Sequence, residues 1–278
     1  MAYRDIRVIG LDLDGTLLTG EKKITPYTYD TLVEAARRGI EIVPSTGRYF
    51  AAMPRIIREM PFVHYCININ GASVAELTTG KKLYTAEIPL AEALDIMRYL
   101  DDKPVLYDCY MEDAGWITGA FKDNAERYVQ DPFYLQFMRD TRQSVPELKE
   151  FIAKRGSNIQ KIQYFTLDHD FQQYGLLHGA ELFPDIICTC SAKDENVEFN
   201  HVRANKGDAL VGLAEALGFG RENTMAFGDG SNDVPMISAA AVGVAMANAC
   251  PEAQAAANFL TFSNEEDGVA RFIREYCL

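Results

Sequence analysis

Residues 7–16 read RVIGLDLDGT, an apolar run that passes into two acidic residues, a glycine and a threonine. The apolar run predicts a short buried strand with Asp12 at its end. Gly15 permits a sharp turn, because it has no Cβ atom to clash. Open parallel sheets bind ligands at the carboxyl ends of their strands, so Asp12 and Asp14 are expected to converge there. The plainer alternative is a pair of loop acids beside a turn glycine.

Strand and helix patterns alternate on the C-terminal side of this segment. Thr25 and Pro26 mark the start of a helix, as N-cap and first helical residue, and Gly39 marks its end. Further elements are predicted as a strand over 40–43, a helix over 49–60, a strand over 66–70 and a hairpin over 72–84. This alternation predicts an α/β fold, in which crossover helices join the strands of a parallel sheet.

The middle of the chain has a different pattern, in which helices are followed by paired strands. Helices are predicted over 90–100, 146–155 and 171–183, and strands over 105–110, 159–167, 186–190 and 196–199. The parallel pattern resumes near Asn205, with a helix that opens at Lys206 and a strand over 224–227. We therefore expect an α+β domain at 87–193, inserted into a core made of 1–86 and 194–278.

A second acidic cluster follows the strand expected at 224–227. Residues 228–233 read GDGSND, which places Asp229 and Asp233 just beyond that strand. Carboxylate oxygens suit Mg²⁺, so two strand ends that both carry carboxylates predict a site for a hard divalent cation. The plainer alternative is that Asn232 and Asp233 cap the next helix, and both roles can coexist.

Two further segments carry groups that could hold a phosphate. Thr46 and Gly47 follow the second expected strand, where a hydroxyl and an exposed backbone N–H can bind phosphate oxygens. Lys206 stands at the start of a helix and could neutralise both a phosphate and a nucleophile. On its own, an isolated lysine is more often a solvated surface charge, and Arg48 could equally be an ordinary helix charge.

The composition limits the classes of partner. The formal net charge of −13 disfavours nucleic acid and anionic membranes, because both attract basic patches. An anionic substrate is still compatible with this charge, since a metal ion can reverse the local field. The sequence has no signal-peptide pattern and no apolar run long enough for a membrane span. We therefore expect a cytoplasmic protein.

The chain contains six cysteines, of which Cys188 and Cys190 form a close pair. Residues two apart in a strand point to the same face, so this spacing alone does not indicate a metal or redox site. Without an export signal, a disulfide framework is not expected. We predict neither bound zinc nor a functional disulfide at this pair, and redox or zinc chemistry is the minor alternative.

These segments occur in an order that resembles the haloacid dehalogenase superfamily, in particular its Cof-type branch of phosphatases with a large cap. The family's motifs are matched by DLDGT at 12–16, STGR at 45–48, KG at 206–207 and GDGSND at 228–233. Further matches are NGA at 70–72, GVAMANA at 243–249 and DGVA at 267–270. The resemblance spans nearly the whole chain and is weak only in the inserted segment. It implies a Rossmann-like core with an inserted cap that sets substrate specificity.

The resemblance also implies a magnesium-dependent phosphatase. Asp12 would attack phosphorus and form an aspartyl-phosphate, while Asp14 would protonate the leaving oxygen and then activate water. Mg²⁺ would be held by Asp12, the main-chain carbonyl of Asp14, and Asp229, and Asp233 would orient Lys206 or a metal-bound water. The transferring phosphoryl group would be gripped by the backbone N–H groups of Leu13, Thr46, Gly47, Lys206 and Asn232.

Two other functions are compatible with these motifs. Related sugar-phosphate mutases share the first motif and the cap type, but a mutase retains the phosphoryl group whereas a phosphatase releases free phosphate. A non-catalytic phosphate-binding or regulatory protein would be expected to lack one of the catalytic residues, and all of them are intact. The expected partner is a small phosphorylated metabolite such as a sugar phosphate. The sequence identifies neither that substrate nor the oligomeric state.

Overall fold

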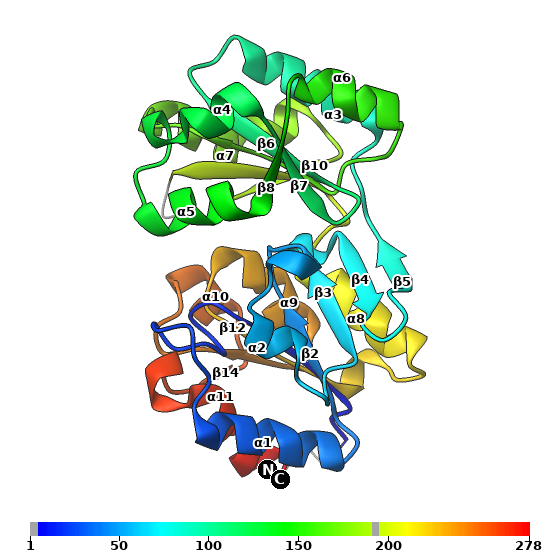
Figure 1. The fold of residues 1–278 in the computed structure, drawn as a ribbon. Coiled ribbons are helices and arrows are strands. Elements are labelled where there is room, and N and C mark those ends of the chain that lie inside the picture. Colours follow the sequence, from blue (N-terminus) through cyan, green and yellow to red (C-terminus); the bar gives the residue numbers. More distant parts are fainter. Residues whose placement is uncertain (1–4, 191–194) are drawn as a thin grey trace. The chain divides into compact units, whose positions relative to one another are not determined.

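The structure, a computed structural model, describes residues 5–190 and 195–278. Contacts within the chain divide it into two compact units. The first, the core unit, takes in the chain up to Arg48, then Met53–Thr85 and Ala204–Leu278. The second, the inserted unit, consists of Tyr49–Ala52 and Ala86–Arg203, and Figure 1 draws most of it in green.

The core unit is built on one eight-stranded sheet. Its strands are β1 (Val8–Asp12), β2 (Glu41–Ser45), β3 (Tyr65–Asn68), β4 (Ser73–Glu76), β5 (Lys82–Thr85), β12 (Thr224–Gly228), β13 (Val242–Ala245) and β14 (Phe259–Leu260). They lie in the order β14-β13-β12-β1-β2-β3-β4-β5. Neighbours are parallel from β14 to β3, and β3, β4 and β5 then run antiparallel. The predicted α/β fold with a parallel core sheet is confirmed.

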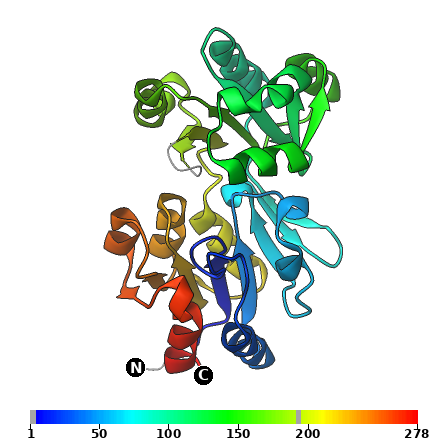
Figure 2. The ribbon, with the colours of Figure 1, turned by 60° about the vertical axis from the view of Figure 1, so that its left-hand side comes forward.

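Helices connect the strands of the core unit, and several of them pack on its sheet. They are α1 (Pro26–Arg37), α2 (Arg55–Arg58), α8 (Lys206–Ala216), α9 (Val234–Ala239), α10 (Pro251–Ala256) and α11 (Gly268–Tyr276), with the short 3₁₀ turns η2 (Ile69–Gly71), η4 (Arg221–Asn223), η5 (Ser231–Asp233) and η6 (Asn264–Glu266). Helix α8 packs against α9. Helix α1 packs against α11, and Figure 1 and Figure 2 draw these two helices in blue and red. Leu210 of α8 joins Val8, Val43 and Ala226 of the strands in a buried apolar cluster.

The starts of α1 and α8 show why these residues form helices. The Thr25 side chain accepts a hydrogen bond from the backbone N–H of Thr28 over 3.1 Å, directly before Pro26. The Asn205 side chain accepts one from Asp208 over 2.8 Å. Both caps satisfy an N–H group that has no partner inside the helix. The cap on α8 therefore fixes the position of Lys206, its first residue.

The helix expected over 49–60 is wrong. These residues form a 3₁₀ turn, η1 (Phe50–Ala52), and the single helical turn α2, with Pro54 between them. Proline has no backbone N–H and its ring clashes with the preceding turn, so a regular helix breaks there. Strand β3 is also shorter than expected, because the residue after Asn68 adopts a positive φ of 53°.

The inserted unit contains its own sheet of six strands. The strands are β6 (Leu106–Met111), β7 (Ala114–Thr118), β8 (Arg142–Val145), β9 (Lys161–Phe165), β10 (Ile186–Thr189) and β11 (Asn196–His201), in the order β10-β11-β9-β6-β7-β8. The helices are α3 (Leu90–Asp101), α4 (Gly119–Asp123), α5 (Pro132–Thr141), α6 (Leu148–Arg155) and α7 (His169–Leu182), with η3 (Ala125–Arg127). Throughout the described ranges, every helix falls short of the length or the apolar character that a bilayer crossing requires.

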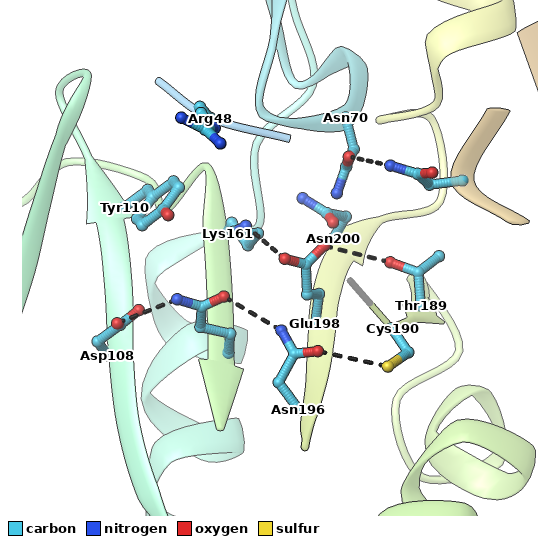
Figure 3. Close-up of polar contacts among 12 residues, drawn as sticks. Arg48, Asn70, Asp108, Tyr110, Lys161, Thr189, Cys190, Asn196, Glu198 and Asn200 are labelled. Carbon is cyan, nitrogen blue, oxygen red and sulfur yellow. Dashed lines mark hydrogen bonds and ion pairs between the residues drawn. The ribbon is translucent and has the colours of Figure 1, made fainter. Parts of the chain in front are cut away.

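The two faces of this second sheet differ in character. On one face, side chains such as Cys109, Ile162 and Tyr164 join a large apolar cluster with the helices. On the other face, ionic pairs are buried: Arg142 donates to Asp108 over 2.8 Å and Lys161 donates to Glu198 over 2.7 Å. Figure 3 shows the polar side chains along this face, including Asp108, Lys161 and Glu198. One face of this sheet is therefore covered by a large apolar core, whereas the polar face combines buried ion pairs with a smaller apolar cluster that includes Leu106 and Phe165.

Strand pairing sets the boundary of the inserted unit later than predicted. Lys193, the expected last residue, lies outside the described residues. Strand β11 pairs with both β9 and β10, so the core does not resume at 194 but at Ala204. Tyr49 also belongs to the inserted unit: its hydroxyl donates to the carbonyl of Thr141 over 2.5 Å. Hydrogen bonds between segments far apart in the chain thus decide where the unit ends.

Candidate active site

Strand β1 ends at Asp12, and the carboxylate of this residue is buried. Lys206 has no exposed surface and donates a hydrogen bond to Asp12 Oδ1 over 2.7 Å. The same ammonium donates to Asp233 Oδ1 over 2.6 Å. The alternative that Lys206 is a solvated surface charge is therefore wrong, because the lysine lies between two buried carboxylates.

Asp12, Asp229 and Asp233 form a compact acidic cluster. Each offers an oxygen atom, and these oxygens all lie within 4.8 Å of one another. Burial, together with the charge of Asp233, raises the pKa of Asp12 well above its ordinary value, although Lys206 opposes this shift. Burial likewise raises the pKa of Asp229 to about 6. Although burial alone would lower the pKa of Lys206, the charges of Asp12 and Asp233 raise it.

The acidic cluster fits a divalent metal ion. Full ionisation would give the cluster three negative charges, and the ammonium of Lys206 offsets one of them. Burial and, to a smaller extent, the neighbouring carboxylates raise the pKa values of Asp12 and Asp229, so a further cation would favour their charged forms. Converging carboxylate oxygens are also the ligands that hard divalent cations prefer. The structure thus brings together the two carboxylates that the sequence predicts as metal ligands, Asp12 and Asp229.

Asp233 is held in place by hydrogen bonds to both of its oxygens. Oδ2 accepts from the backbone N–H groups of Asp229, over 3.0 Å, and Gly230, over 2.9 Å. Oδ1 accepts from the ammonium of Lys206. Asp233 thereby connects the loop after β12 to the buried lysine, which is the contact expected of a residue that orients Lys206.

The turn after β1 is shaped around Asp229. Gly15 has φ +88°, and a Cβ atom on this residue would lie 2.3 Å from Asp229 Oδ2. Glycine is needed here for both reasons, the left-handed backbone and the close approach. Thr16 Oγ1 then donates to Asp229 Oδ1 over 2.7 Å. The first motif therefore positions Asp229 as well as supplying Asp12.

The carboxylate of Asp14 is not a member of the acidic cluster. Lys22 Nζ donates to its Oδ1 and Arg48 Nη2 donates to its Oδ2, both over 2.7 Å. Burial favours a higher pKa for Asp14, but the charges of Arg48 and Lys22 outweigh it and lower the pKa below its ordinary value. In this structure Asp14 is therefore an ionised carboxylate, and it must gain a proton before it can act as an acid.

The structure changes the expectation for Thr46. Its backbone N–H donates to the carbonyl of Ile67 over 2.9 Å and so extends the pairing of β2 with β3. The expectation that this N–H group grips a phosphate is therefore wrong for this arrangement. The Thr46 hydroxyl accepts a hydrogen bond from the backbone N–H of Arg48 over 3.2 Å, and its own hydrogen can still be donated. Thr46 can thus contribute a hydroxyl donor in place of its backbone.

Of the other residues expected to bind phosphate, Leu13 and Asn232 lie on the loops that carry the acidic cluster, and Gly47 lies on the loop after the neighbouring strand β2. Leu13 is in the turn after β1, where its carbonyl accepts from the backbone N–H groups of Thr16 and Leu18. Gly47 follows Thr46 at the end of β2. Asn232 lies in η5, and its side-chain amide donates to Asn70 Oδ1 over 3.3 Å. These loops follow β1, β2 and β12, which are neighbours in the sheet.

Sequence reasoning missed several residues that contact the site. Thr16 could have been found, since it belongs to the quoted DLDGT motif. The sequence leaves Arg48 as a possible helix charge, but its guanidinium pairs with Asp14. Nothing in the sequence singled out Lys22, because a lone lysine in a loop gives no signal of the carboxylate it will meet. In the sequence, Asn70 stands out only as part of the family pattern, and its contact with Asn232 depends on the fold.

Comparison with known proteins identifies the family. The family model for haloacid dehalogenase-like hydrolases matches residues 9–273. The chain belongs to this family. The putative phosphatase YxeH of Bacillus subtilis (strain 168) is 30% identical, covering 98% of each chain. The pyridoxal phosphate phosphatase YbhA of Escherichia coli (strain K12) is 28% identical, covering 98% of this chain and 99% of its own.

A solved structure supports the same assignment. The haloacid dehalogenase-like hydrolase from B. subtilis has a TM-score of 0.83 to this chain and is 28% identical, covering 97% of this chain and 99% of its own. The range matched by the family model includes every site residue that the sequence predicts, from Asp12 to Asp233. The chain is therefore a hydrolase of the phosphatase type, as the resemblance implied.

Proposed function

We propose that this haloacid dehalogenase-like hydrolase is a magnesium-dependent phosphatase that uses Asp12 as a nucleophile on small phosphate monoesters. The observation that carries this proposal is the buried carboxylate of Asp12 at the end of β1, paired with Lys206 and placed beside Asp229 and Asp233. A catalytic nucleophile needs a fixed position and a charged form that survives burial. The ammonium of Lys206 fixes the position of the carboxylate, and together with a bound divalent cation it would stabilise the charged form.

In the first half-reaction an oxygen of Asp12 forms a bond to phosphorus while the bond from phosphorus to the ester oxygen breaks. The products are an aspartyl-phosphate and the alcohol, which needs one proton. Asp14 would supply that proton, as a general acid on the leaving oxygen. Since its ion pairs with Lys22 and Arg48 oppose protonation, we infer that at least one of these cations leaves Asp14 when substrate binds.

In the second half-reaction a water molecule attacks phosphorus and regenerates the Asp12 carboxylate. Asp14, now ionised, would accept the proton of that water, and its lowered pKa suits this role. Inorganic phosphate then leaves. The same carboxylate thereby gives a proton in one step and recovers one in the next.

The phosphoryl group would be held by the loops around the acidic cluster. Lys206 offers its ammonium, Thr46 its hydroxyl, and Leu13, Gly47 and Asn232 lie on loops whose backbone N–H groups can serve as donors. Bound Mg²⁺, held by Asp12, the main-chain carbonyl of Asp14, and Asp229, would supply positive charge between the nucleophile and the phosphate. Asp233 would keep Lys206 aimed at Asp12.

We further propose that the inserted unit selects the leaving group. Every group assigned to the chemistry belongs to the core unit, so a second unit with its own sheet is free to serve specificity. YbhA is named for pyridoxal phosphate, which is a small phosphorylated metabolite, and we expect a substrate of that size here. The polar sheet face of the inserted unit, with Tyr110, Arg142 and Lys161, suits a hydrogen-bonding leaving group better than an apolar one.

The test is phosphate release from a generic aryl phosphate by the purified protein. We expect activity with added Mg²⁺, loss of activity with a chelator, and recovery when Mg²⁺ is returned. Asp12→Asn should abolish release, because the amide is a poor nucleophile. Full activity after thorough metal removal would contradict the metal requirement. Phosphate transfer to a second position of a sugar phosphate without free phosphate would indicate a mutase.

A further inference from the structure

The loop after β3 has an unusual backbone. Ile69, Asn70 and Gly71 have φ values of 53°, 54° and 96° in succession. Glycine adopts such values freely and asparagine tolerates them, but a β-branched isoleucine does so only under constraint. Backbone of this kind persists where surrounding contacts over-determine it, and it is often found at functional sites. The contacts that stabilise this loop therefore indicate its function.

The loop is tied to the segment that carries Thr46 and Gly47. The backbone N–H of Asn70 donates to the carbonyl of Thr46 over 3.0 Å, and that of Ile69 donates to the carbonyl of Arg48 over 3.1 Å. Together with the bond from Thr46 to Ile67, these hydrogen bonds connect the two loops on both sides of Gly47. A shift in one loop must therefore displace the other.

The loop also touches the start of α8. A Cβ atom on Gly71 would lie 2.3 Å from the carbonyl oxygen of Asn205, so glycine is required for this approach. Asn205 caps α8 and directly precedes Lys206. The loop after β3 thus contacts the residue that precedes the buried lysine, as well as the loop of Thr46 and Gly47.

The side chain of Asn70 completes these contacts. It is buried, and its Oδ1 accepts a hydrogen bond from the Asn232 amide over 3.3 Å, the dashed line that leaves Asn70 in Figure 3. The same oxygen would lie 2.9 Å from a Cβ atom on Gly47, so it rests directly against that glycine. Asn70 therefore touches two residues that are assigned to phosphate binding and that lie far apart in the sequence.

We propose that Asn70 is a positioning residue, which holds the Gly47 and Asn232 loops at the spacing that a phosphoryl group requires. This inference rests on the proposed function, because it assumes that these two loops bind phosphate. The left-handed backbone turns the Asn70 side chain between the loops, and its amide oxygen orients the side chain of Asn232. The free energy stored in the constrained loop is offset by the backbone hydrogen bonds to Thr46 and Arg48.

The test compares two glycine variants. Asn70→Gly keeps the left-handed backbone and removes only the side chain. We expect the inhibition constant of inorganic phosphate, and the KM for an aryl phosphate, to rise about tenfold, the equivalent of one lost hydrogen bond near 1.4 kcal/mol. Asp267→Gly is the matched control, since Asp267 also has a positive φ (59°) and also accepts hydrogen bonds, from Thr25 and Thr28. It should lower the melting temperature but leave both constants unchanged.

A double-mutant cycle then tests the pair. Asn232→Ala removes the amide that Asn70 holds but leaves the backbone N–H of residue 232. We expect the double variant to weaken phosphate binding by much less than the product of the two single effects, because both variants remove the same contact. Strictly multiplicative effects would overturn the proposal, as would unchanged phosphate constants in Asn70→Gly.

A second variant covers the case in which Asn70→Gly does not fold, and the wild-type activity separates the role of Asn70 from the proposed function. If Asn70→Gly does not fold, Asn232→Ala alone tests the same contact from the other side. It must then raise the inhibition constant of inorganic phosphate about tenfold; no change would overturn the proposal. A wild-type protein that neither releases nor binds phosphate would overturn the proposed function itself. A fully active wild type with indifferent Asn70 variants would overturn only the role of Asn70.

Discussion

Lys206 is the residue on which the charge balance of the site depends. Lys206→Met keeps the length of the side chain but leaves Asp12 and Asp233 buried without their cation, so we expect the free energy of unfolding to fall by about 3–5 kcal/mol. Lys22→Met is the matched control, because the Lys22 side chain is 42% exposed. It should change the free energy of unfolding by less than about 1 kcal/mol. Denaturant unfolding of the metal-free proteins measures both, and equal effects would contradict a special role for Lys206.

The acidic cluster predicts how stability depends on pH when no metal is bound. The folded state raises the pKa of Asp229 from 3.8 to about 6, so between these values it holds a proton that the unfolded state has lost. The contribution of Asp229 to the free energy of unfolding is therefore fully present below about pH 4. It decreases as the pH rises and is lost above about pH 6. Asp229→Asn should flatten the fall in unfolding free energy between pH 4.5 and 7.5 by on the order of 2 kcal/mol. A wild type and variant with parallel pH profiles would refute this.

At the scale of the element, the turn after β1 shows how one glycine serves a site assembled from two distant motifs. Gly15→Ala would bring a methyl group to 2.3 Å from Asp229 Oδ2 on a backbone with φ +88°. Gly39→Ala is the control, since Gly39 has φ +80° but nothing within 4 Å of its Cβ position. Each variant should lose about 1–2 kcal/mol from backbone strain, but only Gly15→Ala should also lose most phosphatase activity. Equal activities, measured by phosphate release, would show that the approach to Asp229 is unimportant.

The elements that could be predicted are those with local signals. The strand before Asp12, the caps at Thr25 and Asn205, and the motifs at the strand ends all follow from short-range patterns, and parallel pairing then brings Asp12 close to Asp229. The helix predicted over 49–60 is wrong because Pro54 interrupts it. No helix is predicted from the sequence at the position of α5, although Asp131 and Pro132 form a regular helix start. In the structure the Asp131 side chain accepts hydrogen bonds from two backbone N–H groups of this helix.

Contacts between segments far apart in the chain cannot be predicted from sequence patterns, for a physical reason. The ion pair of Lys22 with Asp14 and the hydrogen bond of Asn232 to Asn70 depend on how loops approach in three dimensions. The end of the inserted unit is a similar case, since β11 has a strand pattern whichever sheet it joins. Only its pairing with β9 assigns it to the inserted unit. Sequence patterns therefore located the reacting groups but not the residues that support them.

At the scale of the whole molecule, the chain separates chemistry from selection. The core unit has its own eight-stranded sheet and its own buried apolar cluster, and it holds all of the residues assigned to phosphoryl transfer. The inserted unit has a second sheet, with an apolar core on one face and buried ion pairs beside a smaller apolar cluster on the other. Two units with separate apolar cores can fold and change independently. This division predicts that substrate preference can be removed without removing the reaction.

The last prediction tests this division by joining Thr85 to Ala204 through a short flexible linker, which removes Ala86–Arg203 and leaves only Tyr49–Ala52 of the inserted unit. We expect a folded core with weak activity on small aryl phosphates, because Asp12, Lys206 and Asp229 keep their contacts within the core unit. Its rates on different phosphorylated metabolites should become nearly equal, because the polar sheet that would contact the leaving group is gone. The measurement is kcat/KM for a panel of metabolites, compared with the intact protein, with Asp12→Asn in the shortened chain as the background. A shortened chain that keeps the intact protein's ranking of substrates would place specificity in the core unit and contradict the proposed role of the inserted unit.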